Sequence, residues 1–233
     1  MKTNTLAYIF ALATLASQTA YTQGTTYLSD LNAMTTGNVS IGSDSWAAEI
    51  FFTGNDPNGY LLNSVQLSMA NASGNPSGFT VGLYSVVVRG FGVPGSSLES
   101  LSGTSNPANG GLYAYTPDSN LVLSPNTAYF LVLTSGTTVA NGAYEWNLGG
   151  GNSIQSDHWN IGDNTGNTGY ESSSDGSTWN FNFTDYPQFA INGTIAPEPS
   201  TNMLLGLSLI CLLWCGSKRF TVKKEKARDE INL

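Results

Sequence analysis

The residues best suited to chemistry stand together in the segment Ser156-Asp157-His158. His158 is the only histidine of the 233-residue chain, and it directly follows a serine and an aspartate. A hydrolytic triad needs a nucleophilic hydroxyl, a base and an orienting acid whose side chains converge. Neighbours on a loop or strand point in different directions. This spacing therefore favours an ordinary loop histidine over a triad.

The chain continues from there into a polar, glycine-broken loop that carries calcium-type ligands. Asp157, Asp163, Asn164 and Asn167 offer oxygen atoms, and Ca²⁺ binds about six to eight oxygens of this kind. The loop lacks the regular acidic spacing of an EF-hand, and Asp and Asn are also ordinary turn residues. The sequence leaves a calcium site at Asp157 and Asp163 open and indicates no other cofactor.

A glycoside hydrolase needs two carboxylates roughly 5 to 9 Å apart. The available acids are Glu49, Glu145, Asp157 and Glu171, and nothing in their spacing pairs them. We therefore predict no catalytic residue, and a secreted hydrolase is only the third hypothesis.

Aromatic residues are the other candidates for a functional site, because a flat ring can lie against a sugar face. The candidates are Trp46, Trp146, Trp159 and Trp179. Most large aromatic side chains are buried in cores. Trp159 stands in the polar loop and is expected to be the exposed one. Trp159 and Trp179 thus define an alternative function, a carbohydrate-binding module that contacts exopolysaccharide.

Short β-rich runs separated by turn residues would position all of these side chains. This pattern predicts an all-β fold, an antiparallel, jelly-roll-like β-sandwich. Val65, Leu67 and Met69 alternate with polar residues, as in a strand with one buried face, whereas 129–134 is apolar on both faces and suits a central strand. Asp175-Gly176 predicts a hairpin over 169–184. Strands are expected at 47–53, 62–70, 79–88, 111–116, 129–134, 144–148, 169–173, 179–184 and 188–195.

The charge of this region excludes one class of partner. Twelve Asp and Glu stand against Arg89 alone between residues 21 and 196, a net charge of −11. Nucleic-acid binding depends on neutralising phosphates with Lys and Arg. We therefore expect no nucleic-acid partner.

The N-terminus has the order of a secretory signal. Lys2 precedes the uncharged apolar run 6–16, and small residues follow. We predict a signal peptide over 1–20, with cleavage after Ala20 or near Ala16, and an exported domain over 21–196. Both cysteines, Cys211 and Cys215, lie beyond that domain, which therefore forms no disulfide.

The C-terminus carries a candidate membrane segment. The 19 uncharged residues 199–217 would span about 28 Å as a helix, close to the roughly 30 Å of the bilayer core. Lys218 and Arg219 follow at once, and positive residues hold such a flank in the cytoplasm. We predict one transmembrane helix that these two residues stop, then a charged cytoplasmic tail over 221–233.

Residues 197–220 resemble the PEP-CTERM sorting signal: Pro197-Glu198-Pro199, then an apolar helix, then a basic cluster. The resemblance implies that an exosortase-type membrane peptidase processes the chain at this tripeptide. It also implies a Gram-negative bacterium that delivers the protein to its surface or matrix.

The exported region resembles the choice-of-anchor R domain. The strings that carry the likeness occur in order over roughly residues 40–192 and include "WAAEIFFTG", "LLNSVQLSM" and "LVLSPNTAYFLVLT". That family occurs upstream of surface-anchoring signals, and its biochemical role is not established. The resemblance therefore implies location more than mechanism.

Together these features predict an exported cell-surface or extracellular-matrix protein. Its precursor would be held in the inner membrane and sorted by its C-terminal signal. The expected role is structural or adhesive, not enzymatic.

Overall fold

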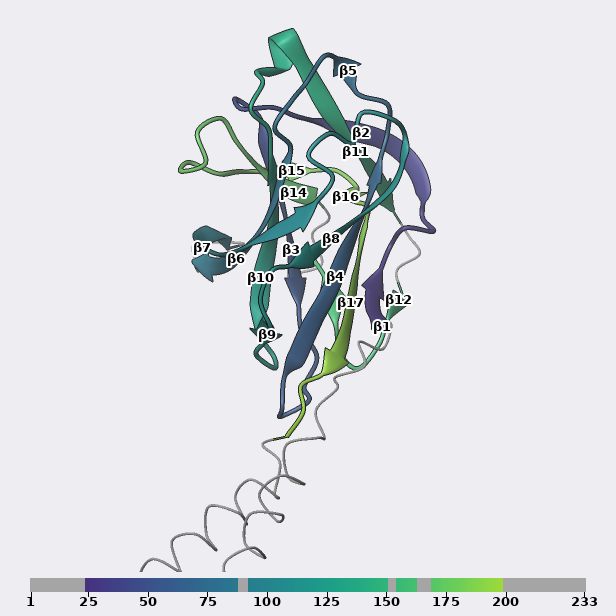
Figure 1. Cartoon of the computed structure of the whole chain (residues 1–233), viewed down its shortest axis with the longest axis vertical. Coiled ribbons are helices and arrows are strands. Elements are labelled where there is room, and N and C mark those ends of the chain that lie inside the picture. The colour runs from purple at the N-terminus through teal and green to yellow at the C-terminus, as the bar shows by residue number, and fades with distance from the viewer. Residues whose placement is uncertain (1–23, 88–91, 151–153, 163–168, 199–233) are drawn as a thin grey trace, which may run out of the picture.

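The protein is an antiparallel all-β domain, as the sequence predicts (Figure 1). The structure is a computed structural model that describes residues 24–87, 92–150, 154–162 and 169–198. The longer strands are β1 (Thr25–Ser29), β2 (Met34–Ile41), β3 (Trp46–Phe52), β4 (Tyr60–Met69), β6 (Thr80–Val87), β7 (Val93–Gly103), β8 (Gly111–Pro117), β10 (Ala128–Thr134), β11 (Gly142–Gly150), β14 (Gly169–Ser173), β15 (Asn180–Phe183) and β17 (Phe189–Ile195). Shorter elements are β5 (Ser73–Gly74), β9 (Val122–Leu123), β12 (Ile154–Gln155), β13 (Asn160–Ile161), β16 (Tyr186–Pro187) and the 3₁₀ helix η1 (Val139–Asn141).

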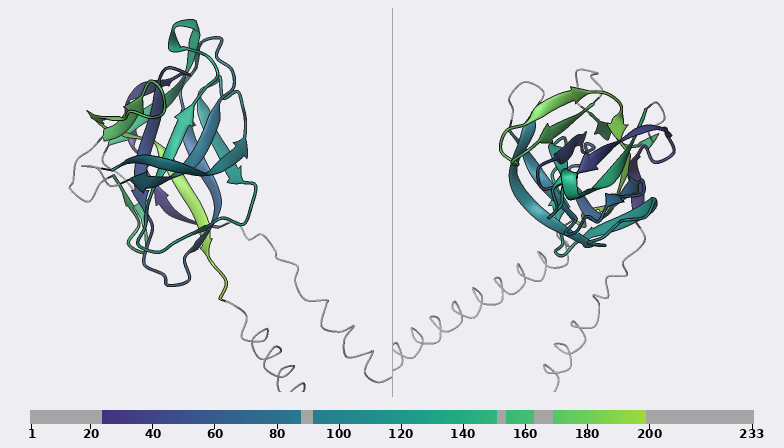
Figure 2. Two further views of the ribbon diagram at one scale, coloured as in Figure 1. Left: turned by 90° about the vertical axis from the view of Figure 1, so that its left-hand side faces the viewer. Right: turned by 90° about the horizontal axis from the view of Figure 1, so that it is seen from above.

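The strands form one continuous sheet that curls around the core. One half runs in the order β12, β1, β17, β4, β8, and the other runs in the order β6, β10, β3, β14, β15. Strand β7 pairs with both β6 and β8 and so joins the two halves. The end-on view in Figure 2 shows the resulting ring of strands. A ribbon of β2 and β11 lies at the upper end in Figure 1.

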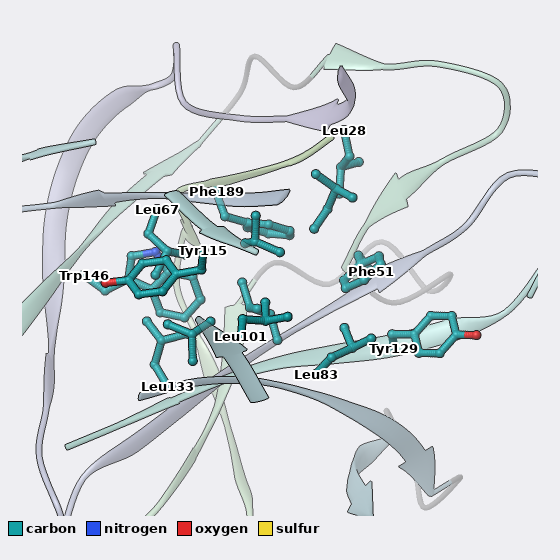
Figure 3. Packing of buried hydrophobic residues seen from close by; sticks show 14 of the residues in the cluster. Leu28, Phe51, Leu67, Leu83, Leu101, Tyr115, Tyr129, Leu133, Trp146 and Phe189 are labelled. Atoms are coloured by element: carbon teal, nitrogen blue, oxygen red, sulfur yellow. The ribbon is translucent and has the colours of Figure 1, made fainter. Parts of the chain in front are cut away.

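Side chains from both halves meet in one apolar core. Leu67 of β4 and Phe189 of β17 belong to the same buried cluster as Phe51 of β3 and Leu83 of β6, and Figure 3 shows them packed together. Since burial of apolar area is the main favourable term in folding, this shared core holds the two halves against each other.

The central strand β10 is buried on both faces, as its sequence predicts. Leu131 and Leu133 belong to the main core, whereas Phe130 and Val132 form a second, smaller cluster with β3 on the outer face of the sheet. Strand β10 lies between β3 and β6. A strand with sheet neighbours on both sides and cover on both faces needs the continuous apolar run observed here.

Two β-bulges shift the register of neighbouring strands at the lower end of the sheet. Along β4 the pairing passes from Leu62 to Ser64 and leaves Asn63 as the extra residue. Along β1 it skips Tyr27 in the same way. A bulge changes which face each following side chain occupies. Tyr27 and Leu28 are consequently both buried.

The predicted hairpin is confirmed, with a wider loop than a two-residue turn. Strands β14 and β15 pair from Gly169 to Ser172, and the closing pair is Ser172 with Asn180. Gly176 has a φ of +72°, a conformation that glycine adopts without strain. Asp175 Oδ1 accepts the backbone N–H groups of Ser177 and Thr178 at 2.8 and 2.9 Å. These bonds hold the pKa of the Asp175 carboxyl below its usual range.

Candidate functional site

The three residues of the candidate triad lie in a tight turn and do not converge. The N–H of Trp159 donates to the carbonyl of Ser156 at 3.0 Å. Asp157 and His158 between them have positive φ angles of 50° and 68°, and both side chains are exposed. The Ser156 hydroxyl donates to the backbone carbonyl of Tyr27 at 3.3 Å. The hydroxyl of Ser156, the candidate nucleophile, is therefore engaged in a structural hydrogen bond.

The prediction that Trp159 is exposed is wrong. Its side chain is only 2% exposed and stacks between Tyr27 and Phe51, with ring centroids at 5.1 and 6.1 Å. Tyr60 meets it edge-on at 4.9 Å. The polar turn faces solvent, but Trp159 directly precedes β13, which pairs with β3, and its ring turns inward. Trp159 therefore has no free face for a sugar.

The other three tryptophans in the described residues differ in their exposure. Trp146 is fully buried, and its Nε1–H donates to the Gln188 carbonyl at 2.9 Å. Trp46 and Trp179 are half-buried and meet edge to face at 6.4 Å. They cover the second cluster beside the hairpin. Of the two predicted sugar-contacting residues, only Trp179 thus keeps an accessible part.

The structure brings two of the four candidate carboxylates together. Glu49 and Glu171 line the same small cavity, with a volume of about 10 Å³. Glu171 is buried, its Oε2 has no hydrogen-bond partner among the described residues, and burial raises its pKa to about 7. A cavity of this size holds about one water molecule. It has no room for a sugar ring.

The remaining candidate carboxylates lie elsewhere. Glu145 of β11 accepts the hydroxyl of Ser40 at 3.0 Å and that of Ser73 at 3.5 Å, so it ties β11 to its neighbours. Asp157 stands in the exposed turn. Glu145 therefore has a structural role, and Asp157 faces solvent.

Of the predicted calcium ligands, only Asp157 lies in the described part of the chain. Asp157 is exposed, while Asp163, Asn164 and Asn167 lie outside the described residues. Within residues 24–87, 92–150, 154–162 and 169–198, no three His, Cys, Asp or Glu side chains group closely enough to hold a metal ion. The calcium site stays a prediction.

A buried carboxyl that the sequence did not single out ends strand β1. Asp30 Oδ1 accepts the N–H of Phe189 at 2.6 Å. Its Oδ2 is buried and has no partner among the described residues. Burial raises the pKa of this carboxyl from 3.8 to about 7. The only signal in the sequence is an aspartate before a turn, which is too common to mark a buried acid.

A large concave feature lies on the outward face of β1, β17, β4 and β8. This polar groove has a volume of about 1490 Å³, and Asp118 is the only charged residue among the described residues that line it. Its principal lining residues carry hydroxyl and amide side chains: Thr26, Ser64, Gln66, Thr116, Asn120 and Asn192. Since Val65 and Leu67 face the core, Gln66 between them turns toward the groove. The alternating sequence of β4 predicts a solvent-facing side for that strand, and it does not predict a groove.

A hydrogen-bonded ladder crosses the floor of the polar groove. The Thr26 hydroxyl donates to Asn192 Oδ1 at 2.6 Å, and Asn192 Nδ2 donates to the Ser64 hydroxyl at 3.1 Å. The ladder therefore joins three adjacent strands and fixes the orientation of the central amide.

Both ends of the described domain leave from the lower end in Figure 1. Thr25 pairs with Gly193, which makes the first and last strands neighbours. Ala196 is buried and donates its N–H to the Gly59 carbonyl at 2.9 Å, and Pro197 and Glu198 are then exposed. Pro199, Lys218 and Arg219 lie outside the described residues, as does the signal peptide.

In the part of the chain that the structure describes, no helix has the length and apolar character needed to cross a membrane. Comparison of the chain with known protein families, curated proteins and solved structures finds no match.

Proposed function

We propose that this chain is an exported cell-surface or extracellular-matrix protein whose β domain is carried on a C-terminal membrane segment. The role is structural or adhesive. An exosortase-type peptidase recognises Pro197-Glu198-Pro199 and sorts the precursor, which a signal peptide over 1–20 has directed out of the cytoplasm. In this proposal the domain is a jelly-roll-like sandwich of the choice-of-anchor R type.

The observation that carries the proposal is the exit of the chain after β17. The last strand ends at the surface, Ala196 is bonded to the turn at Gly59, and the next two residues are exposed. A peptidase needs an accessible, extended substrate, and a residue before proline favours that backbone. This geometry supports cleavage beside the domain without unfolding it.

The arrangement of the two ends gives further support. Because β1 and β17 are neighbours, a leader before β1 and an anchor after β17 would meet the bilayer on the same side of the domain. The opposite end would then face away from the membrane. That end carries β5, η1 and the loops around them (Figure 1).

Fractionation with intact-mass measurement tests the proposal. The full chain is expressed in a Gram-negative host with and without an exosortase-type peptidase. We expect an alkaline-carbonate-resistant membrane form without the peptidase, and a released form ending near Pro199 with it. Changing Pro197 and Pro199 to alanine should abolish release, whereas Pro57→Ala, at another exposed proline, should not.

Two results would contradict the proposal. One is a full-length chain that carbonate extracts from the membrane. The other is a cytosolic chain that still begins at Met1.

A further inference from the structure

We propose that the polar groove binds a neutral polysaccharide chain through hydrogen bonds. This inference goes beyond membrane sorting and does not depend on it, because the groove belongs to the folded domain whether or not the C-terminal segment is cut.

The chemistry of the lining selects the ligand class. Hydroxyl and amide side chains both donate and accept hydrogen bonds, as the hydroxyls of a sugar chain do. Gln66 and Asn120 make no side-chain hydrogen bond to the described residues and face the open groove. In the floor ladder, Asn192 Nδ2 uses one of its two N–H groups on Ser64. The second N–H and the Ser64 hydroxyl hydrogen remain for a ligand.

Other occupants fit this surface less well. A nucleic acid or an anionic polysaccharide would meet Asp118 within a domain of net charge −11, and like charges repel. A lipid or an amphipathic helix needs an apolar floor, but here hydroxyl and amide side chains interrupt the few apolar lining residues, Leu61, Leu62, Ala114 and Pro117. An added peptide strand needs a free sheet edge, whereas the groove lies on the face of paired strands.

Two β-bulges distort the backbone of the strands that form the groove. The two bulges of this sheet half, at Tyr27 and Asn63, flank Asn192 from either side. Bulges are frequent next to binding sites because they redirect a side chain. Here they place Thr26, Asn192 and Ser64 on one face while Tyr27 and Leu62 remain in the core.

Among the described residues that line the groove, none is aromatic, and this determines what kind of binding to expect. Without a ring to stack on, each sugar unit gains little beyond hydrogen bonds, which compete with water. A long groove that engages several units at once compensates by adding contacts along one chain. We therefore expect binding to polymers and weak binding to monosaccharides.

Affinity electrophoresis of the purified full chain in mild detergent tests the inference. The probes are three neutral polysaccharides (dextran, laminarin and galactomannan) and one anionic polysaccharide (alginate). We expect at least one neutral polymer to retard the protein and alginate to leave its mobility unchanged. Asn192→Ala removes the centre of the ladder and should weaken retardation at least about tenfold.

A matched pair of variants on β8 separates groove binding from general surface effects. Ala114 is exposed within the groove, so Ala114→Glu places a carboxylate there and should abolish retardation. Leu112 lies two residues away on the same strand and is 63% exposed outside the lining. Leu112→Glu carries the same added charge and should bind as the wild type does. Circular dichroism establishes that each variant is folded.

Three outcomes would overturn the inference: no neutral polymer retards the folded wild-type chain, Ala114→Glu binds as well as Leu112→Glu, or alginate retards the chain as strongly as the neutral polymers. Failure of membrane sorting would leave this assay unaffected. The two proposals can therefore fail separately.

Discussion

Replacing Asp30 with asparagine should make the stability of the protein less sensitive to pH. Asp30 is 3% exposed, and its Oδ1 accepts the N–H of Phe189. Burial raises the pKa of the carboxyl from 3.8 to about 7. Between pH 3.8 and about 7, Asp30 therefore keeps its proton in the folded chain and has lost it in the unfolded chain. Asparagine has the same shape, can accept the same hydrogen bond and stays neutral at every pH.

The sign and size of the effect follow from proton linkage. Between the two pKa values the folded state binds more protons, so the free energy of unfolding falls as the pH rises. The contribution of the protonated Asp30 carboxyl to the free energy of unfolding is complete below pH 3.8. It falls as the pH rises and is lost once the pH passes about 7. At about 1.4 kcal/mol per pKa unit, the wild type loses about 4 kcal/mol across this window. Asp30→Asn avoids that loss, so its advantage over the wild type should grow by about that amount from pH 4 to pH 8.

Urea unfolding of the full chain in mild detergent, followed by tryptophan fluorescence, measures this difference. Asp118→Asn is the matched control, since it removes the same charge from an exposed position, and it should keep the pH profile of the wild type. The reasoning is refuted if the difference between Asp30→Asn and the wild type stays constant with pH, or if the variant is the less stable protein at pH 8.

Three further substitutions test the packing. Trp159→Ala should cost about 3–5 kcal/mol of unfolding free energy because it empties an aromatic stack, and Trp159→Phe should cost less; equal urea midpoints for Trp159→Ala and the wild type would contradict the buried position. Gly54→Ala should destabilise by about 1–3 kcal/mol, because a Cβ there meets the Asp157 carbonyl and the Tyr60 hydroxyl, whereas Gly37→Ala meets nothing; thermal unfolding compares the two. Glu171→Gln should gain stability over the wild type as the pH rises from 4.5 through about 7, and a gain that shrinks over this range in urea titrations would oppose that sign.

The sequence predicts those strands whose apolar side chains follow a recognisable pattern. In β4, Val65, Leu67 and Met69 alternate with polar residues and are buried. The uninterrupted apolar run of β10 identifies a central strand. Burial of one face requires an alternating apolar pattern, and burial of both faces requires a continuous apolar run; each can be read from the chain directly.

Strands β2 and β7 escape prediction because their pairing does not depend on an apolar pattern. The sequence of β2, Met34–Ile41, is MTTGNVSI, and its first five residues are exposed. It is a strand because it pairs with β11, about a hundred residues later. β7 contains Pro94 and Gly95, which resemble turn residues, yet it bridges β6 and β8. The distant partner of β2 leaves no local signal, and in β7 the proline and glycine conceal a strand whose partners are its neighbours in sequence.

Trp159 shows a different limit of sequence reasoning. A polar, glycine-rich neighbourhood correctly predicts a surface loop, and the turn at Asp157 and His158 is exposed. The next side chain is aimed by the backbone geometry of that turn, whose two positive φ angles reverse the chain. Composition predicts where the backbone runs. It does not predict which way a single ring points.

The polar groove could not be predicted from the sequence for a related reason. Strict alternation through β4 would place Leu62 and Ser64 on the same face, since they are two positions apart. The bulge at Asn63 breaks that parity, so Leu62 is buried while Ser64 joins the ladder. Together with the bulge at Tyr27, it brings side chains from three strands into one polar row around Asn192. A surface that depends on bulges in the two strands on either side of β17 is a property of the assembled sheet, and no single strand sequence carries it.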